Sequence, residues 1–378
     1  MLTPTETRFH TIETPVTLRS GATLPSVTNA YEIYGELNED RSNAILVFHA
    51  LTGSHHAAGF TASVPGAYRW NEECQRGWWD SFIGPGRAFD TERFAVIAIN
   101  VLGGCYGTTG PSSINPETGR RYGSSFPRVS LCDMVDIQMQ VLDELGIEKL
   151  HAVTGGSVGG YMCLSLATRY PDRVDRVIPI ASGIEVTSLQ HLHNFEQITA
   201  IVNDEHFNGG DYYDGPSPDK GLALARMIQH KTFVSLKGME YRARQEVVPT
   251  VELPEHVHIE YAVESYMWYQ GQKFIDRFDA NTFLRIIDAW ETFDLLGPTD
   301  AIDEVELLRS CKDQRFLVFT VDSDVCFYPE EQDKMVNLLA FAGVNAEHVH
   351  ISSDKGHDSF LLDAPLYTPY LREFLSRP

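Results

Sequence analysis

Residues 150–161 read LHAVTGGSVGGY, in which a short apolar run passes into GGSVG at residues 155–159 and a helical pattern begins at Tyr161. In such a strand-turn-helix context, a G-x-S-x-G pentapeptide forms a sharp, strained turn that lifts the serine oxygen above a sheet. Glycines permit the turn because they lack a Cβ. We therefore expect Ser157 to be a nucleophile and the backbone N–H of Val158 to be one donor to an oxyanion.

The segments around this turn predict a sheet of mostly parallel strands. Short, β-branched apolar runs, typical of strands buried on both faces, recur at residues 44–48, 94–99, 150–153, 177–181, 316–320 and 348–351. Amphipathic helical stretches lie between several of them, for example at residues 131–145. This alternation indicates an α/β architecture with right-handed crossovers, and together with the serine turn it predicts the α/β-hydrolase fold.

The strand pattern is interrupted in the second half of the chain. Three long helical segments follow one another there without convincing strands, at residues 188–202, 221–236 and 263–278. We therefore predict a helical lid domain of residues 183–298, inserted into a core formed by residues 1–182 and 299–378. One large core with an insertion is the natural expectation for 378 residues.

A serine hydroxyl is a poor nucleophile near neutral pH and needs a general base. In this fold an acid and then a histidine follow the serine along the chain. The predicted strand at residues 316–320 is followed by Asp322 and Asp324, and His357 comes after the next strand. His357 is therefore the predicted base, and on these grounds both aspartates remain candidates for the acid that orients it.

The second oxyanion donor is expected in the loop after an early strand. The predicted strand at residues 44–48 leads into HALTG at residues 49–53, where the backbone N–H of Leu51 is the candidate donor and Thr52 is expected to line the pocket. His49 could be a second base or a residue that fixes the loop, and we favour the loop-fixing interpretation.

Composition and charge exclude several other classes of protein. The chain has 30 basic and 52 acidic residues, and its net charge of -22 disfavours binding to nucleic acid or to an anionic membrane surface. The six cysteines are scattered without a CxxC pair, and no stretch approaches the roughly 18 apolar residues of a membrane-spanning helix. We therefore expect a cytoplasmic protein with no nucleic-acid or membrane partner, in which a polyanionic ligand needs a local cluster of Arg or Lys.

Three His-x-His pairs invite a metal interpretation: His191/His193, His256/His258 and His348/His350. None of them has a nearby third ligand at the usual sequence spacing. We therefore predict no metal site.

Segments spread over the chain closely resemble the homoserine O-acetyltransferase family: residues 49–53, 84–91, 100–116, 209–213, 225–228, 263–266, 277–281 and 356–358. The likeness spans nearly the whole chain, the lid included. It implies an enzyme of methionine biosynthesis that takes acetyl from acetyl-CoA onto Ser157 and passes it to the side-chain hydroxyl of L-homoserine by a ping-pong route. Acetyl-CoA is then a co-substrate, no cofactor is needed, and the lid helices form a homodimer.

Carried over position by position, the resemblance assigns the nucleophile, the orienting acid and the base to Ser157, Asp324 and His357. It thereby sets Asp322 aside. The resemblance also makes Arg226 and Asp358 the substrate-binding pair. These charges make sense because a zwitterionic amino acid needs a cation for its carboxylate and an anion for its ammonium group.

The chain departs from the usual family pattern at three positions near the predicted site. Val158 stands where a methionine is usual, and Lys231 and Phe233 stand where the lid commonly has isoleucine and tyrosine. The alternatives are therefore the same fold using succinyl-CoA or accepting serine, a simple esterase or hydrolase, and an inactive binding module. Residues 321–329 contain no Lys or Arg for a succinyl carboxylate, which favours acetyl, although Lys231 could supply a cation from the lid.

Overall fold

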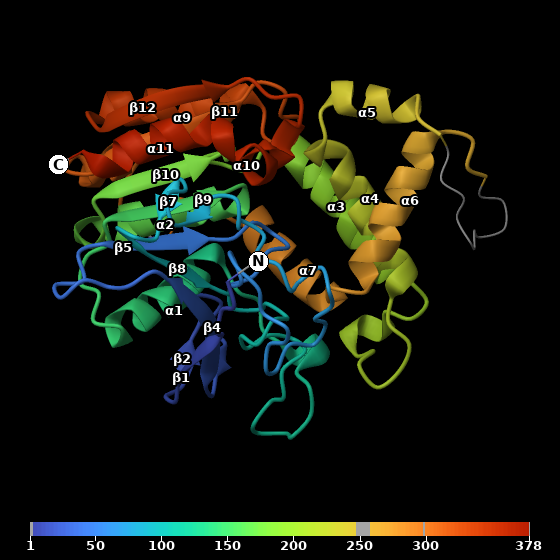
Figure 1. Cartoon of the computed structure of the whole chain (residues 1–378). Coiled ribbons are helices and arrows are strands. Elements are labelled where there is room, and N and C mark those ends of the chain that lie inside the picture. Colours follow the sequence, from blue (N-terminus) through green and yellow to red (C-terminus); the bar gives the residue numbers. More distant parts are fainter. Residues whose placement is uncertain (1–2, 247–257, 298, 378) are drawn as a thin grey trace.

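The computed structural model of the chain describes residues 3–246, 258–297 and 299–377. An eight-stranded sheet in the order β1-β4-β8-β5-β9-β10-β11-β12 forms its centre and lies on the left of Figure 1. The strands are β1 Arg8–Ile12, β4 Val27–Tyr34, β5 Ala44–Phe48, β8 Ala95–Ile99, β9 Ala152–Gly156, β10 Arg176–Ile180, β11 Arg315–Val321 and β12 Asn345–Ile351. Neighbours from β8 to β12 pair in parallel, whereas β4 is antiparallel to both β1 and β8.

All six predicted strands and the mostly parallel sheet are confirmed. Every residue of β5, β8, β9 and β10 is buried, because helices and loops cover both faces of the sheet. Two small two-stranded sheets accompany the large one, formed by β2 Val16–Thr17 with β3 Thr23–Leu24, and by β6 Ile83–Gly84 with β7 Phe89–Asp90.

The sequence analysis missed β1 and β4. The sequence of β4, VTNAYEIY, interrupts its apolar residues with Asn29 and Glu32, yet both polar side chains are buried. The Glu32 carboxylate accepts a hydrogen bond from the hydroxyl of Tyr34 at 2.8 Å and lies 3.0 Å from Nδ1 of His56. These polar contacts stabilise the buried carboxylate. Because Asn29 and Glu32 interrupt the apolar run, the sequence pattern did not predict this strand.

Two apolar cores, one on each face of the sheet, hold the helices of the hydrolase core in place. The first contains buried residues of α1 Leu131–Glu144, α2 Val158–Arg169 and α9 Pro329–Ala342, and the second contains those of α11 Ala364–Ser376. The short helices α8 Glu304–Leu308 and α10 Ser359–Leu362 complete this part of the chain.

Between β10 and β11 the described residues form six α-helices, of which α8 is the last; the other five are α3 Ser188–Val202, α4 Asp219–Phe233, α5 Leu236–Ala243, α6 Ala262–Ile275 and α7 Ala280–Glu291. Helices α3 to α6 stand beside the sheet on the right of Figure 1. They occupy the region predicted as a lid, whose last predicted residue, 298, lies outside the described residues. The predicted helix at 221–236 was wrong at its end, because α4 stops at Phe233 and Ser235 caps α5 by accepting a hydrogen bond from Gly238 N at 3.1 Å.

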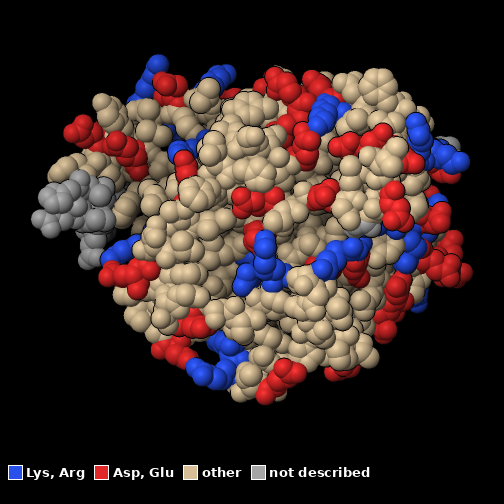
Figure 2. Space-filling view, turned by 180° about the vertical axis from the view of Figure 1, so that it is seen from behind, with Lys and Arg blue, Asp and Glu red and all other residues tan. Residues whose placement is uncertain are grey.

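The surface agrees with the acidic composition. Figure 2 shows Asp and Glu side chains scattered over one face of the molecule, with Lys and Arg lying among them. Within the part of the chain that the structure describes, none of the helices combines the length and the apolar character needed to cross a bilayer.

Candidate active site

Ser157 lies at the turn between β9 and α2, with φ 59° and ψ −127°. A non-glycine residue at positive φ costs on the order of 1–3 kcal/mol and persists only where the surroundings enforce it. Here the Ser157 N–H donates to the carbonyl of Ile180 in β10 at 3.0 Å. On the other side, a Cβ added at Gly159 would lie 2.5 Å from the carbonyl oxygen of Phe48 in β5. The two strands that flank β9 therefore fix the turn.

The carboxylate of Asp324 contacts the predicted base. Its Oδ2 lies 2.7 Å from Nδ1 of His357, and its Oδ1 accepts hydrogen bonds from the backbone N–H groups of Cys326 and Phe327 at 2.8 and 2.9 Å. Asp322 is exposed, and its carboxylate accepts a hydrogen bond from the backbone of a neighbouring loop instead. The structure thus brings Asp324, and not Asp322, to His357.

His357 is buried among three aromatic rings. The Phe327 ring stacks on it at 5.2 Å between centroids, Phe233 lies at 5.6 Å, and Phe360 meets it edge-on at 5.3 Å. Burial alone would lower the pKa of His357, but the negative charge of Asp324 and their hydrogen bond raise it above the ordinary histidine value. Its Nε2 has no hydrogen-bond partner among the described residues, so this atom is available to take a proton.

A cavity of about 510 Å³ opens over both Ser157 and His357, and Leu51 and Thr52 line it from the loop after β5. Val158 lines a smaller pocket of about 20 Å³ that also reaches Ser157 and Leu51. As the first residue of α2, Val158 has an N–H that precedes the helical hydrogen-bond ladder and can serve an anion. The structure therefore places both predicted oxyanion residues beside Ser157.

The loop that carries Leu51 is fixed by His49. The Nδ1 atom of His49 lies 2.8 Å from the carbonyl oxygen of Ala50, and its Nε2 accepts a hydrogen bond from the Val101 N–H at 3.2 Å. Burial lowers the pKa of His49 to about 4, so the ring is neutral at pH 7 and both of its nitrogens are engaged. This geometry agrees with a loop-fixing residue and not with a second base.

A cation and an anion line the same cavity. Arg226 extends into the cavity from α4, and Asp358, the residue after His357, also lines it. The guanidinium of Arg226 lies 5.3 Å from the ring centroid of Phe233 and 5.0 Å from that of Phe274. Burial lowers the pKa of Arg226 to about 10. It also raises the pKa of Asp358 to about 6, against the opposing attraction of His357 and Arg226. No ion pair of 4.0 Å or less joins these two described side chains, and Nη1 of Arg226 donates a hydrogen bond to Oε1 of Gln229 at 3.0 Å. Both side chains line the cavity, where a ligand can reach them.

Several residues of the site were not identified from the sequence. Phe327 and Phe360 enclose His357 together with Phe233, and aromatic residues in scattered segments carry no sequence signal for such a role. Arg277, in the turn after α6, donates from Nη1 to the carbonyl of Thr52 at 3.2 Å and thereby holds the loop after β5 in place. The segment at 277–281 had drawn attention only through the family resemblance.

The His-x-His pairs differ from one another in the structure. The first pair lies on α3, where residues i and i+2 do not face each other. His256 of the second pair lies outside the described residues. His348 and His350 lie on β12, where Asp333 of α9 provides a third potential ligand. The sequence spacing did not reveal this neighbour, because Asp333 is close to the two histidines in space and not in sequence.

Comparison with known proteins matches these features to a family. The model of a family described as alpha/beta hydrolase fold matches residues 43–364. A homoserine O-succinyltransferase from Magnetococcus marinus is 42% identical over 100% of this chain and 95% of that protein. A homoserine O-acetyltransferase from Deferribacter desulfuricans is 41% identical over 98% of this chain and 96% of that protein.

Two solved structures extend the comparison. A homoserine O-acetyltransferase from Bacillus anthracis has a TM-score of 0.87 and 30% identity, and the match covers 100% of this chain and 99% of that one. Esterase E22 has a TM-score of 0.86 and 28% identity, with 99% of this chain and 100% of that chain covered. The same overall fold therefore occurs in proteins named as transferases and in one named as an esterase.

We predict that Asp324→Asn lowers the turnover of a chromogenic acetate ester by about 10⁴-fold, the loss known for the equivalent change in a serine protease. The amide can no longer hold the His357 tautomer or stabilise its imidazolium form. Asp322→Asn is the matched control and should stay close to the wild-type rate. The opposite ranking of the two variants would show that Asp324 is not the orienting acid.

The acylation rate should also depend on pH through His357. Since the base must be neutral and its pKa is raised, single-turnover acylation by the ester without an acceptor should fall with decreasing pH, with a midpoint above about 6.5. In Asp324→Asn the midpoint should move to lower pH, because the charge that raises the pKa is gone. An unchanged midpoint in that variant would contradict this assignment.

Proposed function

The chain belongs to the α/β-hydrolase fold family and, within it, to the homoserine O-acyltransferases, and we propose that it acts as a homoserine O-acetyltransferase. It transfers acetyl from acetyl-CoA to the side-chain hydroxyl of L-homoserine through an acyl-serine intermediate, a step of methionine biosynthesis. The observation that carries the proposal is the presence of Arg226 and Asp358, which form no ion pair with each other among the described residues, in the cavity of Ser157. An enzyme that only hydrolyses simple esters has no need of two partly buried opposite charges.

The donor half-reaction follows from the contacts of the triad. Nε2 of His357 takes the proton of the Ser157 hydroxyl as Oγ attacks the thioester carbon, and Asp324 stabilises the imidazolium that results. The N–H groups of Leu51 and Val158 stabilise the oxyanion of the tetrahedral intermediate. When that intermediate collapses, the carbon–sulfur bond breaks and the imidazolium returns its proton to the departing coenzyme thiolate. Ser157 is left as an acetyl ester.

The acceptor half-reaction uses the same base with a different partner. Arg226 binds the homoserine carboxylate and Asp358 binds its ammonium group, which directs the side-chain hydroxyl toward the acetyl ester. His357 takes the hydroxyl proton as the oxygen attacks the ester carbon, and then returns that proton to Oγ of Ser157. The products are O-acetylhomoserine and the enzyme with the hydroxyl of Ser157 restored.

Cations along the cavity support a coenzyme ligand in this acidic protein. Arg76, Lys273 and Arg277 line the same cavity as Ser157. Lys273 and Arg277 are both paired with Glu73, and Arg76, whose side chain is 65% exposed, is paired with Asp80 at 3.4 Å. Such a local group is what the phosphates of a coenzyme need against a net charge of -22.

The small pocket beside Ser157 favours acetyl over succinyl. Its volume of about 20 Å³ corresponds to roughly one water molecule. Its described lining contains no Lys, Arg, Asp or Glu; besides apolar residues and Ser157 it consists of Gln190, His193, Asn194, Gln197, Gln229, Thr232 and Cys326. Lys231 is exposed and lines neither this pocket nor the larger cavity. A succinyl carboxylate in this small pocket would therefore lack a Lys or Arg partner, whereas a methyl group needs none.

The lid surface and the cysteines support the assembly and location that we propose. Leu192 and Phe195 on α3 and Leu224 on α4 are exposed apolar side chains of the kind that a second copy would cover, which supports a homodimer through the lid helices. All six cysteines are free, as expected in the reducing cytoplasm.

The proposal is tested by offering acetyl-CoA or succinyl-CoA with L-homoserine or L-serine and following free thiol and O-acyl product together. We expect acetyl-CoA with homoserine to be fastest and to give equal amounts of thiol and product. Acetyl-CoA alone should leave one acetyl adduct on the intact protein, and Ser157→Ala should lose both the adduct and the activity. Rapid thiol release without an acceptor would instead indicate a hydrolase, and faster turnover of succinyl-CoA would reject the acetyl assignment.

Arg226→Ala should separate the two half-reactions. We expect the KM for homoserine to rise strongly while acetylation of Ser157 by acetyl-CoA stays near the wild-type rate, because the guanidinium binds only the acceptor. Arg226→Lys should restore part of the loss, since an ammonium keeps the charge but cannot make the planar pair of hydrogen bonds. Stopped-flow measurements of each half-reaction provide the readout. Slow acetylation with an unchanged homoserine KM would place Arg226 in the coenzyme site.

A further inference from the structure

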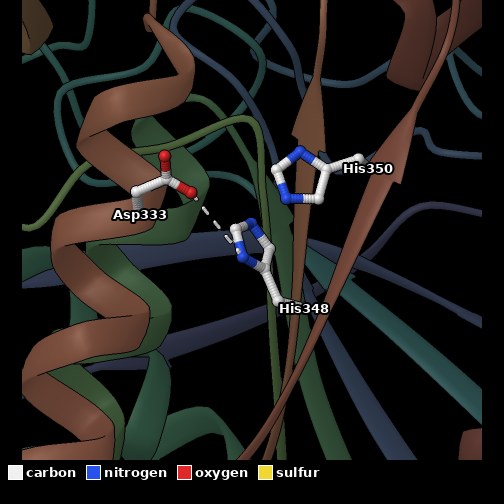
Figure 3. Close-up of side chains that lie close together, drawn as sticks. All are labelled: Asp333, His348 and His350. Carbon is white, nitrogen blue, oxygen red and sulfur yellow. Dashed lines mark ion pairs between the residues drawn. The ribbon is translucent and has the colours of Figure 1, made fainter.

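Three side chains able to bind a metal lie together outside the active site: Asp333 on α9, and His348 and His350 on β12. One potential ligand atom of each lies within 4.8 Å of those of the other two. Figure 3 shows the three side chains pointing toward one another across the space between the helix and the strand. The two histidines are two residues apart on a strand, so both project from the same face, with 4.2 Å between their ring centroids.

The separation between His348 and Asp333 is close to that between two ligands of one bound ion. Nδ1 of His348 lies 3.8 Å from Oδ1 of Asp333. With bonds of about 2.0–2.1 Å, two ligand atoms around a tetrahedral zinc ion lie roughly 3.4 Å apart. The difference is a few tenths of an ångström, and rotation of the exposed Asp333 side chain can close it without any movement of the backbone.

His348 is already oriented by a contact behind it. Its Nε2 lies 2.8 Å from Oγ1 of Thr320, a fully buried residue of β11. When Nε2 carries the proton and donates to this hydroxyl, the lone pair of Nδ1 is directed to the side of Asp333. Metal-binding histidines are commonly held by such a contact of the second ring nitrogen.

We propose that Asp333, His348 and His350 bind a divalent transition-metal ion of the zinc type. Two imidazoles and one carboxylate suit such an ion, whereas Mg²⁺ and Ca²⁺ prefer a full set of oxygen ligands. Asp333 and His350 are exposed, so the ion enters from solvent and water completes its coordination. The site lies apart from the cavity of Ser157 and is independent of the acyl-transfer proposal.

The ion would connect α9 and β12, which adjoin the loops of Asp324 and His357. Helix α9 begins after the loop of Asp324, and β12 leads into the loop of His357. Strand β12 lies at the edge of the sheet and pairs only with β11. A metal bridge between α9 and β12 therefore fastens the edge strand, and it stabilises the protein because the unfolded chain does not hold the three ligands together.

Calorimetric titration of the tag-free protein with Zn²⁺, together with the visible absorption of bound Co²⁺, tests the proposal. We expect one ion per chain and at least about tenfold weaker binding in both His350→Ala and Asp333→Asn. Both of these side chains are exposed, so the variants should fold, whereas replacement of His348 would also break its contact with Thr320. His191→Ala, which removes an exposed histidine of the pair on α3, is the matched control and should bind like the wild type.

A thermal readout adds an independent check. Zn²⁺ should raise the Tm of the wild type and of His191→Ala by a few degrees, and it should leave His350→Ala and Asp333→Asn nearly unchanged. Absence of saturable binding to the wild type overturns the proposal. Wild-type affinity in either site variant also overturns it, because the substituted residue is then not a ligand of the ion.

Discussion

Ser157 holds a backbone conformation that only its neighbours can maintain. Its positive φ places Oγ at the end of β9 and starts α2 directly behind it. Neighbouring residues pack so tightly on both sides of the turn that Gly156 and Gly160 have no room for a side chain. A Cβ at Gly156 would lie 2.5 Å from the ring of Phe360, and one at Gly160 would lie 2.4 Å from Cβ of Ser182. Because the sheet, the helix and the base loop all meet at this turn, the position of the nucleophile is set by the core as a whole.

The remaining parts of the site come from two sources with different tasks. The carboxyl ends of β11 and β12 bring Asp324 and His357 to the serine, as the geometry of a parallel sheet dictates. The lid supplies Arg226 and the ring of Phe233, which lies between this guanidinium and the imidazole. Under the proposed function, the core provides acyl-transfer chemistry of a general kind, and Arg226 of the lid acts with Asp358 of the core to select the molecule that receives the acyl group. This division explains how an esterase and an acyltransferase can share one fold.

The features predicted from the sequence are those that depend on local patterns. Buried parallel strands leave continuous apolar runs, and the serine turn leaves its glycines. Strand β4 was not predicted because the buried Glu32 interrupts its apolar pattern. The partners of Glu32, His55 and His56, come from a later loop of the chain. Asp322 and Asp324 are too close in sequence for a pattern to separate, so only the family resemblance distinguished them. Asp333 could not be connected with His348 because packing of α9 on β12, and not spacing, brings them together.

The position of the helical insertion has a consequence for how the chain folds. It leaves the sheet after β10 and returns at β11, although these strands are direct neighbours, with Ile180 paired to Phe319. During synthesis, the strands up to β10 emerge long before β11, so the sheet first forms with an open edge at β10. An unpaired apolar edge is a template for wrong pairing and aggregation, and closing so long a loop slows the correct pairing. Yield in a host cell should therefore depend on chaperone capacity at this stage more than on the stability of the finished enzyme.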